Sequence, residues 1–190
     1  MTLCTAIIPS RGRIDQLFRC IDSIIQSASG DDYQIHVRLD DNDDSSLARV
    51  SELEAYPVVK VEIGNSPGWS GLDQMVYGPV ANASKSTWVW ILNDDMTIKA
   101  EGKNWDDLLR EVPTTGYWCE PEFHQLNDSV YENDERSCAP LFRTRCWRDL
   151  GVSQDLPSPC DYVLVDILKN RGWKPWFLKG LRVWHQRNKP

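Results

Sequence analysis

The sequence contains no Cys-x-x-Cys pair, although six cysteines are spread over its 190 residues. A structural zinc site needs clustered ligands, so this scatter argues against one and fits reduced thiols in a cytoplasmic protein. No apolar run approaches the roughly 20 residues of a membrane span. The apolar run near the N-terminus is also too short for a signal peptide. The sequence therefore predicts a cytoplasmic protein with no membrane span.

An excess of positive charge is also missing, because the formal net charge is -7. Such a protein has no overall field to attract nucleic acid or an anionic membrane. Neither Gly-x-x-x-x-Gly-Lys nor Gly-x-Gly-x-x-Gly occurs, which argues against the common phosphate-binding loops. If an acidic chain of this kind handles a nucleotide, a divalent cation is expected between the two.

Alternating strand and helix patterns fill the first half of the chain. A content of 41% apolar and 26% charged residues is ordinary for one globular domain of this length. The βαβ order predicts a parallel sheet with right-handed crossovers, and hence an α/β single domain with a mostly parallel central sheet and helices on both faces. The expected strands are 3–8, 33–39, 58–63 and 87–92, and the expected helices are 14–25, 47–54 and 70–83.

The second half of the sequence is less regular. Its patterns predict shorter elements separated by polar or proline-containing segments. Helices are expected at 105–111, 145–150 and 161–171, and strands at 116–120, 139–142, 176–178 and 181–184.

Polar residues follow three of the predicted parallel strands. The first strand ends in Pro9-Ser10-Arg11, the second in Asp40-Asp41, and the fourth in Asn93-Asp94-Asp95. In open α/β sheets ligands bind beyond the carboxyl ends of the strands. The sequence therefore predicts one ligand site at this edge of the sheet, without naming its chemistry.

The order of these motifs resembles the family 2 glycosyltransferases with the GT-A fold, which is related to the Rossmann fold. IIPSRGR, VRLDDND and WILNDDM look like the donor-side motifs of that family. Later, CDYVLVDILKNRG looks like its acceptor-side helix, and VWHQ like the histidine segment of metal-dependent members. The resemblance implies a donor half, residues 1–100, and an acceptor half, residues 101–190, within one domain.

The function implied by the resemblance is a metal-dependent, inverting transfer of one sugar. The donor would be a nucleoside-diphosphate sugar, with UDP-sugar favoured, the acceptor a hydroxyl group, and the cofactor Mn²⁺ or Mg²⁺. The Gln-x-x-Arg-Trp signature of processive polysaccharide synthases is missing, which favours a single addition. The compact second half indicates that the acceptor site is completed by a partner protein, by a second copy in a homo-oligomer, or by the acceptor itself.

The resemblance assigns the nucleotide to residues at the first two strand ends. Asp41 would read the base, since a carboxylate can accept hydrogen bonds from a nucleobase N–H and a ribose hydroxyl. Asp40, Pro9 and Arg11 would line the same pocket. The alternative is an Asx-turn, which is the better interpretation for residues 43–44.

The family's Asp-x-Asp motif corresponds to Asn93-Asp94-Asp95, with asparagine at its first position. By resemblance, Asp95 and His185 would hold the metal, while Asn93 would bond the ribose or a metal-bound water. Asp94 lies between them and is assigned to the nucleotide, although an extended backbone would point it elsewhere. The alternatives are a polar turn for the acidic motif and a solvated side chain for His185.

Asp161 falls where the family's Glu-Asp pair places the catalytic base, although Cys160 replaces the glutamate. A base takes the proton from the acceptor hydroxyl as it attacks the anomeric carbon. An ordinary helix N-cap is the structural alternative for Asp161.

Two other functions compete with the transferase. A sugar-phosphate nucleotidyltransferase shares the parallel sheet, but PSRGR is a poor version of its triphosphate-binding loop. A non-catalytic nucleotide-sugar-binding relative is favoured by Asn93 and Cys160.

Overall fold

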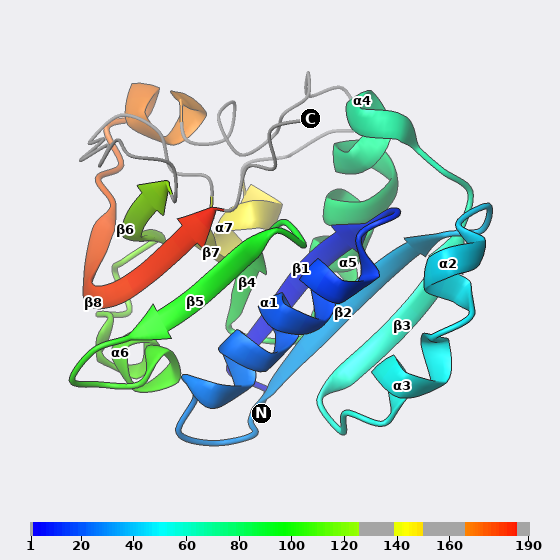
Figure 1. The fold of residues 1–190 in the computed structure, drawn as a ribbon. Coiled ribbons are helices and arrows are strands. Elements are labelled where there is room, and N and C mark those ends of the chain that lie inside the picture. Colours follow the sequence, from blue (N-terminus) through cyan, green and yellow to red (C-terminus); the bar gives the residue numbers. More distant parts are fainter. Residues whose placement is uncertain (1, 126–138, 150–165, 186–190) are drawn as a thin grey trace.

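The computed structural model describes residues 2–125, 139–149 and 166–185. These residues form an eight-stranded sheet in the order β3-β2-β1-β4-β7-β6-β8-β5, with helices on both faces (Figure 1). The strands are β1 (Cys4–Ser10), β2 (Tyr33–Asp40), β3 (Val59–Gly64), β4 (Trp88–Ile91), β5 (Met96–Ala100), β6 (Trp118–Gln125), β7 (Leu141–Arg143) and β8 (Trp176–His185). The helices are α1 (Ile14–Gln26), α2 (Asp44–Leu47), α3 (Val50–Glu54), α4 (Gly68–Leu72), η1 (Asp73–Tyr77), α5 (Gly78–Ala83), α6 (Trp105–Glu111) and α7 (Thr144–Asp149), with a further helical segment at 166–170.

The first four strands pair in parallel, as the sequence predicts. β1 lies between β2 and β4, and β3 pairs with the outer edge of β2. Parallel strands buried on both faces carry continuous apolar runs, and residues 4–8 of β1 are almost completely buried. The carboxyl ends of these strands therefore meet at one edge of the sheet.

The rest of the sheet is mixed and differs in detail from the sequence patterns. β7 is antiparallel to both β4 and β6, while β8 is parallel to β6 and antiparallel to β5. β5 had no predicted counterpart. The two strands expected at 176–178 and 181–184 are one strand, β8, which passes through Gly180 at a φ of 87°.

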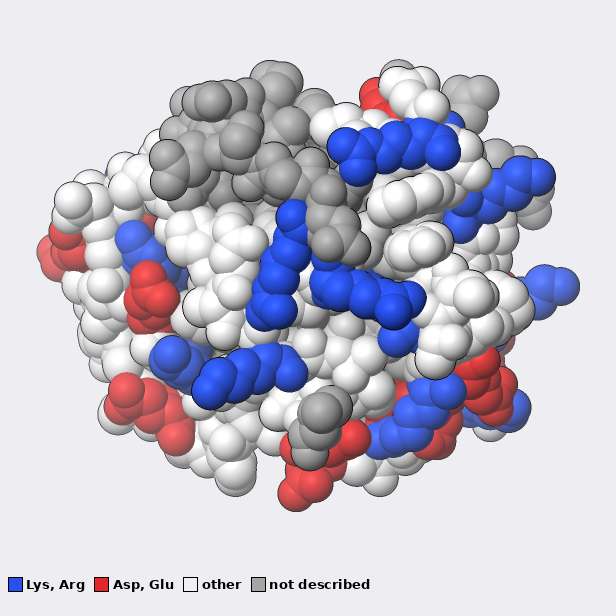
Figure 2. All heavy atoms as spheres, turned by 180° about the vertical axis from the view of Figure 1, so that it is seen from behind, with Lys and Arg blue, Asp and Glu red and all other residues white. Residues whose placement is uncertain are grey.

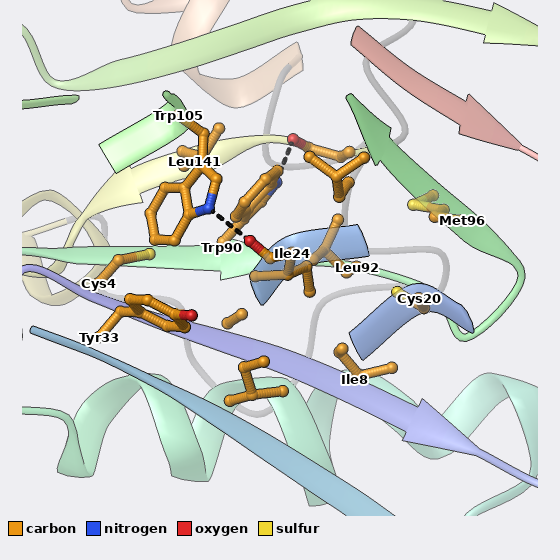
Figure 3. Close-up of a cluster of buried hydrophobic side chains, with 14 of the residues drawn as sticks. Cys4, Ile8, Cys20, Ile24, Tyr33, Trp90, Leu92, Met96, Trp105 and Leu141 are labelled. Carbon is orange, nitrogen blue, oxygen red and sulfur yellow. Dashed lines mark hydrogen bonds between the residues drawn. The ribbon is translucent and has the colours of Figure 1, made fainter. Parts of the chain in front are cut away.

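The sheet separates two apolar layers. Ala6 and Ile8 face a layer built with α1, α3 and α6, whereas Ile7 faces a layer built with η1, α5 and α7. Figure 3 shows part of the first layer, where Trp105 donates from Nε1 to the Ile24 carbonyl at 3.0 Å. The helices thus cover both faces, and the predicted fold class is confirmed.

The predicted helix at 70–83 is observed as three consecutive helical segments, α4, η1 and α5, starting at Gly68. Pro79 lies in the first turn of α5, where its missing N–H is tolerated. The wider π-helical turn η1 precedes it, and Tyr77 at its end donates from its hydroxyl to the Leu92 carbonyl at 3.2 Å. This contact connects the helix to the loop after β4.

None of the helices in the described ranges is long and apolar enough to cross a membrane.

Candidate functional site

A pocket of about 180 Å³ opens at the carboxyl edge of the parallel strands. Four predicted residues line it, namely Pro9, Arg11, Asp40 and Asn93. Ser10, from the same strand end as Pro9 and Arg11, also lines it. The other lining residues, which the sequence did not single out for a ligand, are Arg13, Ser66, Pro67, Gly68 and Leu72. The three strand ends thus meet at one pocket, and the ligand site there stays a prediction.

Arg11 bridges two walls of this pocket. Its Nη1 donates to Ser66 Oγ at 2.8 Å, and its Nε lies 3.6 Å from Asp40 Oδ2. The Arg11 side chain is 58% exposed, whereas the Asp40 side chain is 10% exposed. The pocket therefore presents an accessible cation beside a mostly buried carboxylate.

Asp40 and Asp41 occupy different environments. Asp40 is the last residue of β2 and lines the pocket, while Asp41 is exposed and is not among the lining residues. The Asp41 backbone N–H donates to the Gly64 carbonyl at 2.9 Å. Because successive side chains of a strand point to opposite sides, a shift of one residue decides which carboxylate faces the pocket.

Asp43 fixes the loops that frame the pocket. Its carboxylate accepts from the Gly12 N–H at 2.6 Å and from the hydroxyls of Ser45 and Ser46, and it caps α2. Burial raises the pKa of Asp43, but these hydrogen bonds outweigh that effect and lower it to about 2. The predicted turn role of this residue is confirmed.

Arg13 binds both acidic residues that follow β4. Its Nη2 lies 2.6 Å from Asp94 Oδ1, and its Nη1 donates to Asp95 Oδ2 at 3.0 Å. Asp94 is fully buried and also accepts from the Ser10 hydroxyl at 2.7 Å. Burial raises the pKa of Asp94 to about 6, even though Arg13 and Ser10 act in the opposite direction. This carboxylate therefore faces protein groups and does not line the pocket.

His185 reaches the same acidic motif from the far end of the chain. Antiparallel pairing of β8 with β5 sets His185 opposite Met96, which directly follows Asp95. His185 Nε2 consequently lies 3.0 Å from Asp95 Oδ1, and both side chains are largely buried. The structure thus brings the two predicted metal ligands together.

The spacing of these two atoms fits a hard divalent cation. Two neighbouring ligands of an octahedral ion, each at roughly 2.1 Å, lie about 3 Å apart. The 3.0 Å between His185 Nε2 and Asp95 Oδ1, which is the distance of their direct ion pair, is also compatible with this value. Within the described ranges no group of three or more His, Cys, Asp or Glu side chains forms a metal site.

Asn93 lines the pocket from the loop after β4 and is contacted by η1 and α1. Its Oδ1 accepts from the Tyr77 hydroxyl at 3.4 Å, and its backbone carbonyl lies 3.6 Å from Cys20 Sγ.

The predicted base Asp161 lies outside the described residues.

No protein-family model and no curated protein matches this sequence. Solved structures are nevertheless similar over nearly the whole chain. Residues 1–349 of S. aureus TarS in complex with UDP-GlcNAc give a TM-score of 0.73 at 12% identity, covering 99% of this chain and 59% of that one. The same TarS fragment in complex with UDP gives 0.71 at 13% identity, covering 98% and 61%.

The mannosyltransferase PcManGT from Pyrobaculum calidifontis, in complex with GDP-Man and Mn²⁺, gives a TM-score of 0.72 at 12% identity. The match covers 98% of this chain and 57% of PcManGT. This chain therefore spans about three fifths of the length of these solved structures. Identities this low show the fold alone. The chain has the GT-A fold of nucleotide-sugar transferases.

Proposed function

We propose that this protein is a glycosyltransferase that moves a sugar from a nucleoside-diphosphate sugar to an acceptor hydroxyl. The proposal depends above all on one observation, the Asp95–His185 pair beside a pocket at the carboxyl edge of a GT-A sheet. The similar structures were solved with UDP, UDP-GlcNAc, or GDP-Man and Mn²⁺, which supports a ligand of this class.

A divalent cation, Mn²⁺ or Mg²⁺, fits the proposed site. Asp95 and His185 would hold it, and it would supply charge neutralisation to the diphosphate as that group departs. Arg13 holds the second oxygen of Asp95 and so fixes how this carboxylate is presented. We propose that Asp94 serves the nucleotide indirectly, by orienting Arg13.

The remaining donor contacts follow from the pocket. Asp40 takes the base-reading role that the resemblance gives to Asp41, because its side chain lines the pocket. Asp41 stays a candidate contact at the exposed rim. Arg11 and Pro9 flank the same space, and Arg11 is exposed enough to reach a ligand.

The division into a donor half, 1–100, and an acceptor half, 101–190, also stays a proposal. His185 belongs to the second half yet lies at the donor site, so the two halves would share the metal. We keep Asp161 as the proposed base of an inverting transfer, in which it takes the proton of the acceptor hydroxyl.

A melting experiment with UDP, GDP, ADP, CMP and dTDP, each with Mn²⁺ or EDTA, tests the donor site. At about 100 times Kd a ligand stabilises the fold by roughly 2.7 kcal/mol, so one diphosphate should raise the melting temperature clearly with Mn²⁺ and much less with EDTA. Asp95→Asn should remove the metal-dependent part. Asp31→Asn, at an exposed position outside the pocket, is the matched control.

Equal shifts with Mn²⁺ and with EDTA would contradict the metal assignment. A metal-dependent shift without sugar transfer to any acceptor would favour the non-catalytic relative. Release of pyrophosphate from a nucleoside triphosphate and a sugar phosphate would identify a nucleotidyltransferase.

A further inference from the structure

A second polar groove, of about 270 Å³, lies near the opposite edge of the sheet. It is bordered by the turn between α5 and β4 and by α7, on the face that carries α5 (Figure 1). Its lining consists of four cations, Lys85, Arg143, Arg145 and Arg148, and five serine and threonine residues. Among the side chains that the structure describes, no acidic and no apolar residue lines it. Figure 2 shows this face, with Lys and Arg gathered over its middle and Asp and Glu closer to its margins.

The arginines of this groove differ from other arginines in the protein. Arg49 and Arg110 each form ion pairs with two or more carboxylates. None of the three groove arginines forms an ion pair with a carboxylate in the described parts of the chain. Since the whole protein has a net charge of -7, this cluster of cations, which no described carboxylate pairs with, is a local exception.

Backbone carbonyls hold these guanidinium groups in place. Arg148 Nη2 donates to the Ser84 carbonyl at 2.8 Å, and Arg145 Nη2 donates to the Thr114 carbonyl. Arg143 Nε donates to the Gly116 carbonyl at 2.6 Å. Each guanidinium has five N–H donors, so Arg145 and Arg148 retain donors for a ligand. Their positions are set before any ligand arrives, which lowers the entropic cost of binding.

Aromatic rings also contact two of the groove arginines. Arg143 lies over the ring of Trp88 at 4.4 Å, and Arg145 lies over the ring of Tyr117 at 5.7 Å. Arg143 and Arg145 are close enough for their like charges to interact. Burial and the neighbouring charge of Arg145 lower the pKa of Arg143. An anion in the groove would relieve this repulsion, because attraction to several cations exceeds that to one.

We propose that this groove is a binding site for a phosphate group, separate from the donor pocket. Arginine forks match the oxygens of phosphate, and serine and threonine hydroxyls donate to the remaining oxygens. A dianion also compensates the four cations better than a single carboxylate would. The group could belong to a soluble phosphorylated molecule or to a phospholipid head group, and it is independent of the proposed transferase function.

Titration of the ¹⁵N-labelled full chain with inorganic phosphate at low ionic strength tests the site, because salt screens such contacts. Amide resonances of residues 84–87 and 143–148 should shift. Arg145→Gln and Arg148→Gln should each weaken the affinity roughly tenfold, as expected when a charge-assisted hydrogen bond is lost. Arg19→Gln is the matched control, since Arg19 is exposed on α1 outside the groove and makes no ion pair in the described chain.

The proposal is overturned if the shifts are confined to residues 9–13 and 66–68, or if Arg145→Gln and Arg148→Gln both bind phosphate as tightly as the Arg19→Gln control. Two further arms distinguish the sources. Sedimentation with phosphatidylglycerol vesicles that requires Arg145 and Arg148 would identify a head group. Binding of glycerol phosphate without retention on vesicles would identify a soluble ligand.

Discussion

Arg13 controls the electrostatics of the candidate donor site. It is the partly exposed partner of one fully buried carboxylate, Asp94, and of a second carboxylate, Asp95, which is 8% exposed. Removing one partner of a buried ion pair leaves an uncompensated charge, which is more destabilising than removing both. The site therefore depends on a residue that lies outside the acidic motif itself.

Arg13→Gln should lower the free energy of unfolding by about 2 kcal/mol at pH 8, below the 3–5 kcal/mol typical of a fully buried pair because Arg13 is partly exposed. Without this cation the pKa of Asp94 would rise further above about 6. A carboxyl group whose pKa is raised in the folded state destabilises the fold fully above that folded pKa, and this destabilisation shrinks as the pH falls from the folded pKa toward the ordinary value of 3.8. The loss should therefore be smaller at pH 5 than at pH 8. Urea unfolding at both pH values measures it, and equal losses would contradict the assignment.

Asp43 gives the opposite pH dependence. Its pKa is about 2 in the folded protein against an ordinary value of 3.8, so its hydrogen bonds stabilise the fold above pH 3.8. This stabilisation, about 2 kcal/mol at most, disappears as the pH falls from 3.8 to 2. Asp43→Asn should therefore be less stable than the wild type at pH 7, and the difference should shrink toward pH 2. Asp44→Asn, at the exposed next position, is the control.

The residues that line the pocket could be predicted from the sequence only where they directly follow a recognisable apolar strand. Arg11 and Asn93 follow apolar strands, and the structure places both at the pocket. The sequence did not single out Arg13, because its role depends on reaching across 82 positions to Asp95. The resemblance gives base reading to Asp41, whereas Asp40 is the residue that lines the pocket, because β2 ends at Asp40.

At the scale of elements, β8 brings His185, near the C-terminus, to the acidic motif that follows β4. It pairs with β6 on one side and with β5 on the other, and its register sets His185 beside Asp95. An irregularity between Pro121 and Glu122 of β6 accompanies the turn of β8 at Gly180. The strand can bend here because glycine tolerates a positive φ.

Gly180→Ala should destabilise the protein by on the order of 2 kcal/mol. The φ of 87° is strained for alanine, and an added Cβ would lie 2.6 Å from the Glu101 carbonyl oxygen, which is backbone and cannot rotate away. Gly102→Ala is the control, since its φ of 83° is comparable but no atom lies within 4 Å of an added Cβ. Chemical denaturation of both variants compares steric contact with strain alone. Equal losses would show that the close approach has no effect.

Elements with strong periodicity could be predicted, and those defined by tertiary pairing could not. α1 begins at Ile14 as predicted, because its apolar residues recur at helical spacing. β5 has only five residues and comes directly after the acidic motif, so its sequence reads as a loop until β8 pairs with it. The π-helical turn before α5 has no signal in the periodicity.

At the scale of the whole molecule, the two proposed halves share one sheet. β7 from the second half pairs with β4, and β5 from the first half pairs with β8. Trp90 of β4 donates from Nε1 to the Ala139 carbonyl at 3.1 Å, across the same boundary. These contacts predict that the halves unfold as one unit, because neither has a complete sheet alone.

Buried cysteines in both halves can be used to follow the unfolding of each half. Four of them, none in a disulfide, are Cys4, Cys20, Cys119 and Cys146. Burial raises the pKa values of the Cys4 and Cys20 thiols, and raises that of Cys119 to about 12, so alkylation in the native state should need unfolding. Pulsed alkylation followed by mass spectrometry across a urea series should give one free energy of unfolding and one urea dependence for Cys20 and Cys119. Of the six cysteines, at most two should react in native buffer. If Cys119 and Cys146 react at lower urea than Cys4 and Cys20, the acceptor half opens separately, and the prediction of a single cooperative domain is wrong.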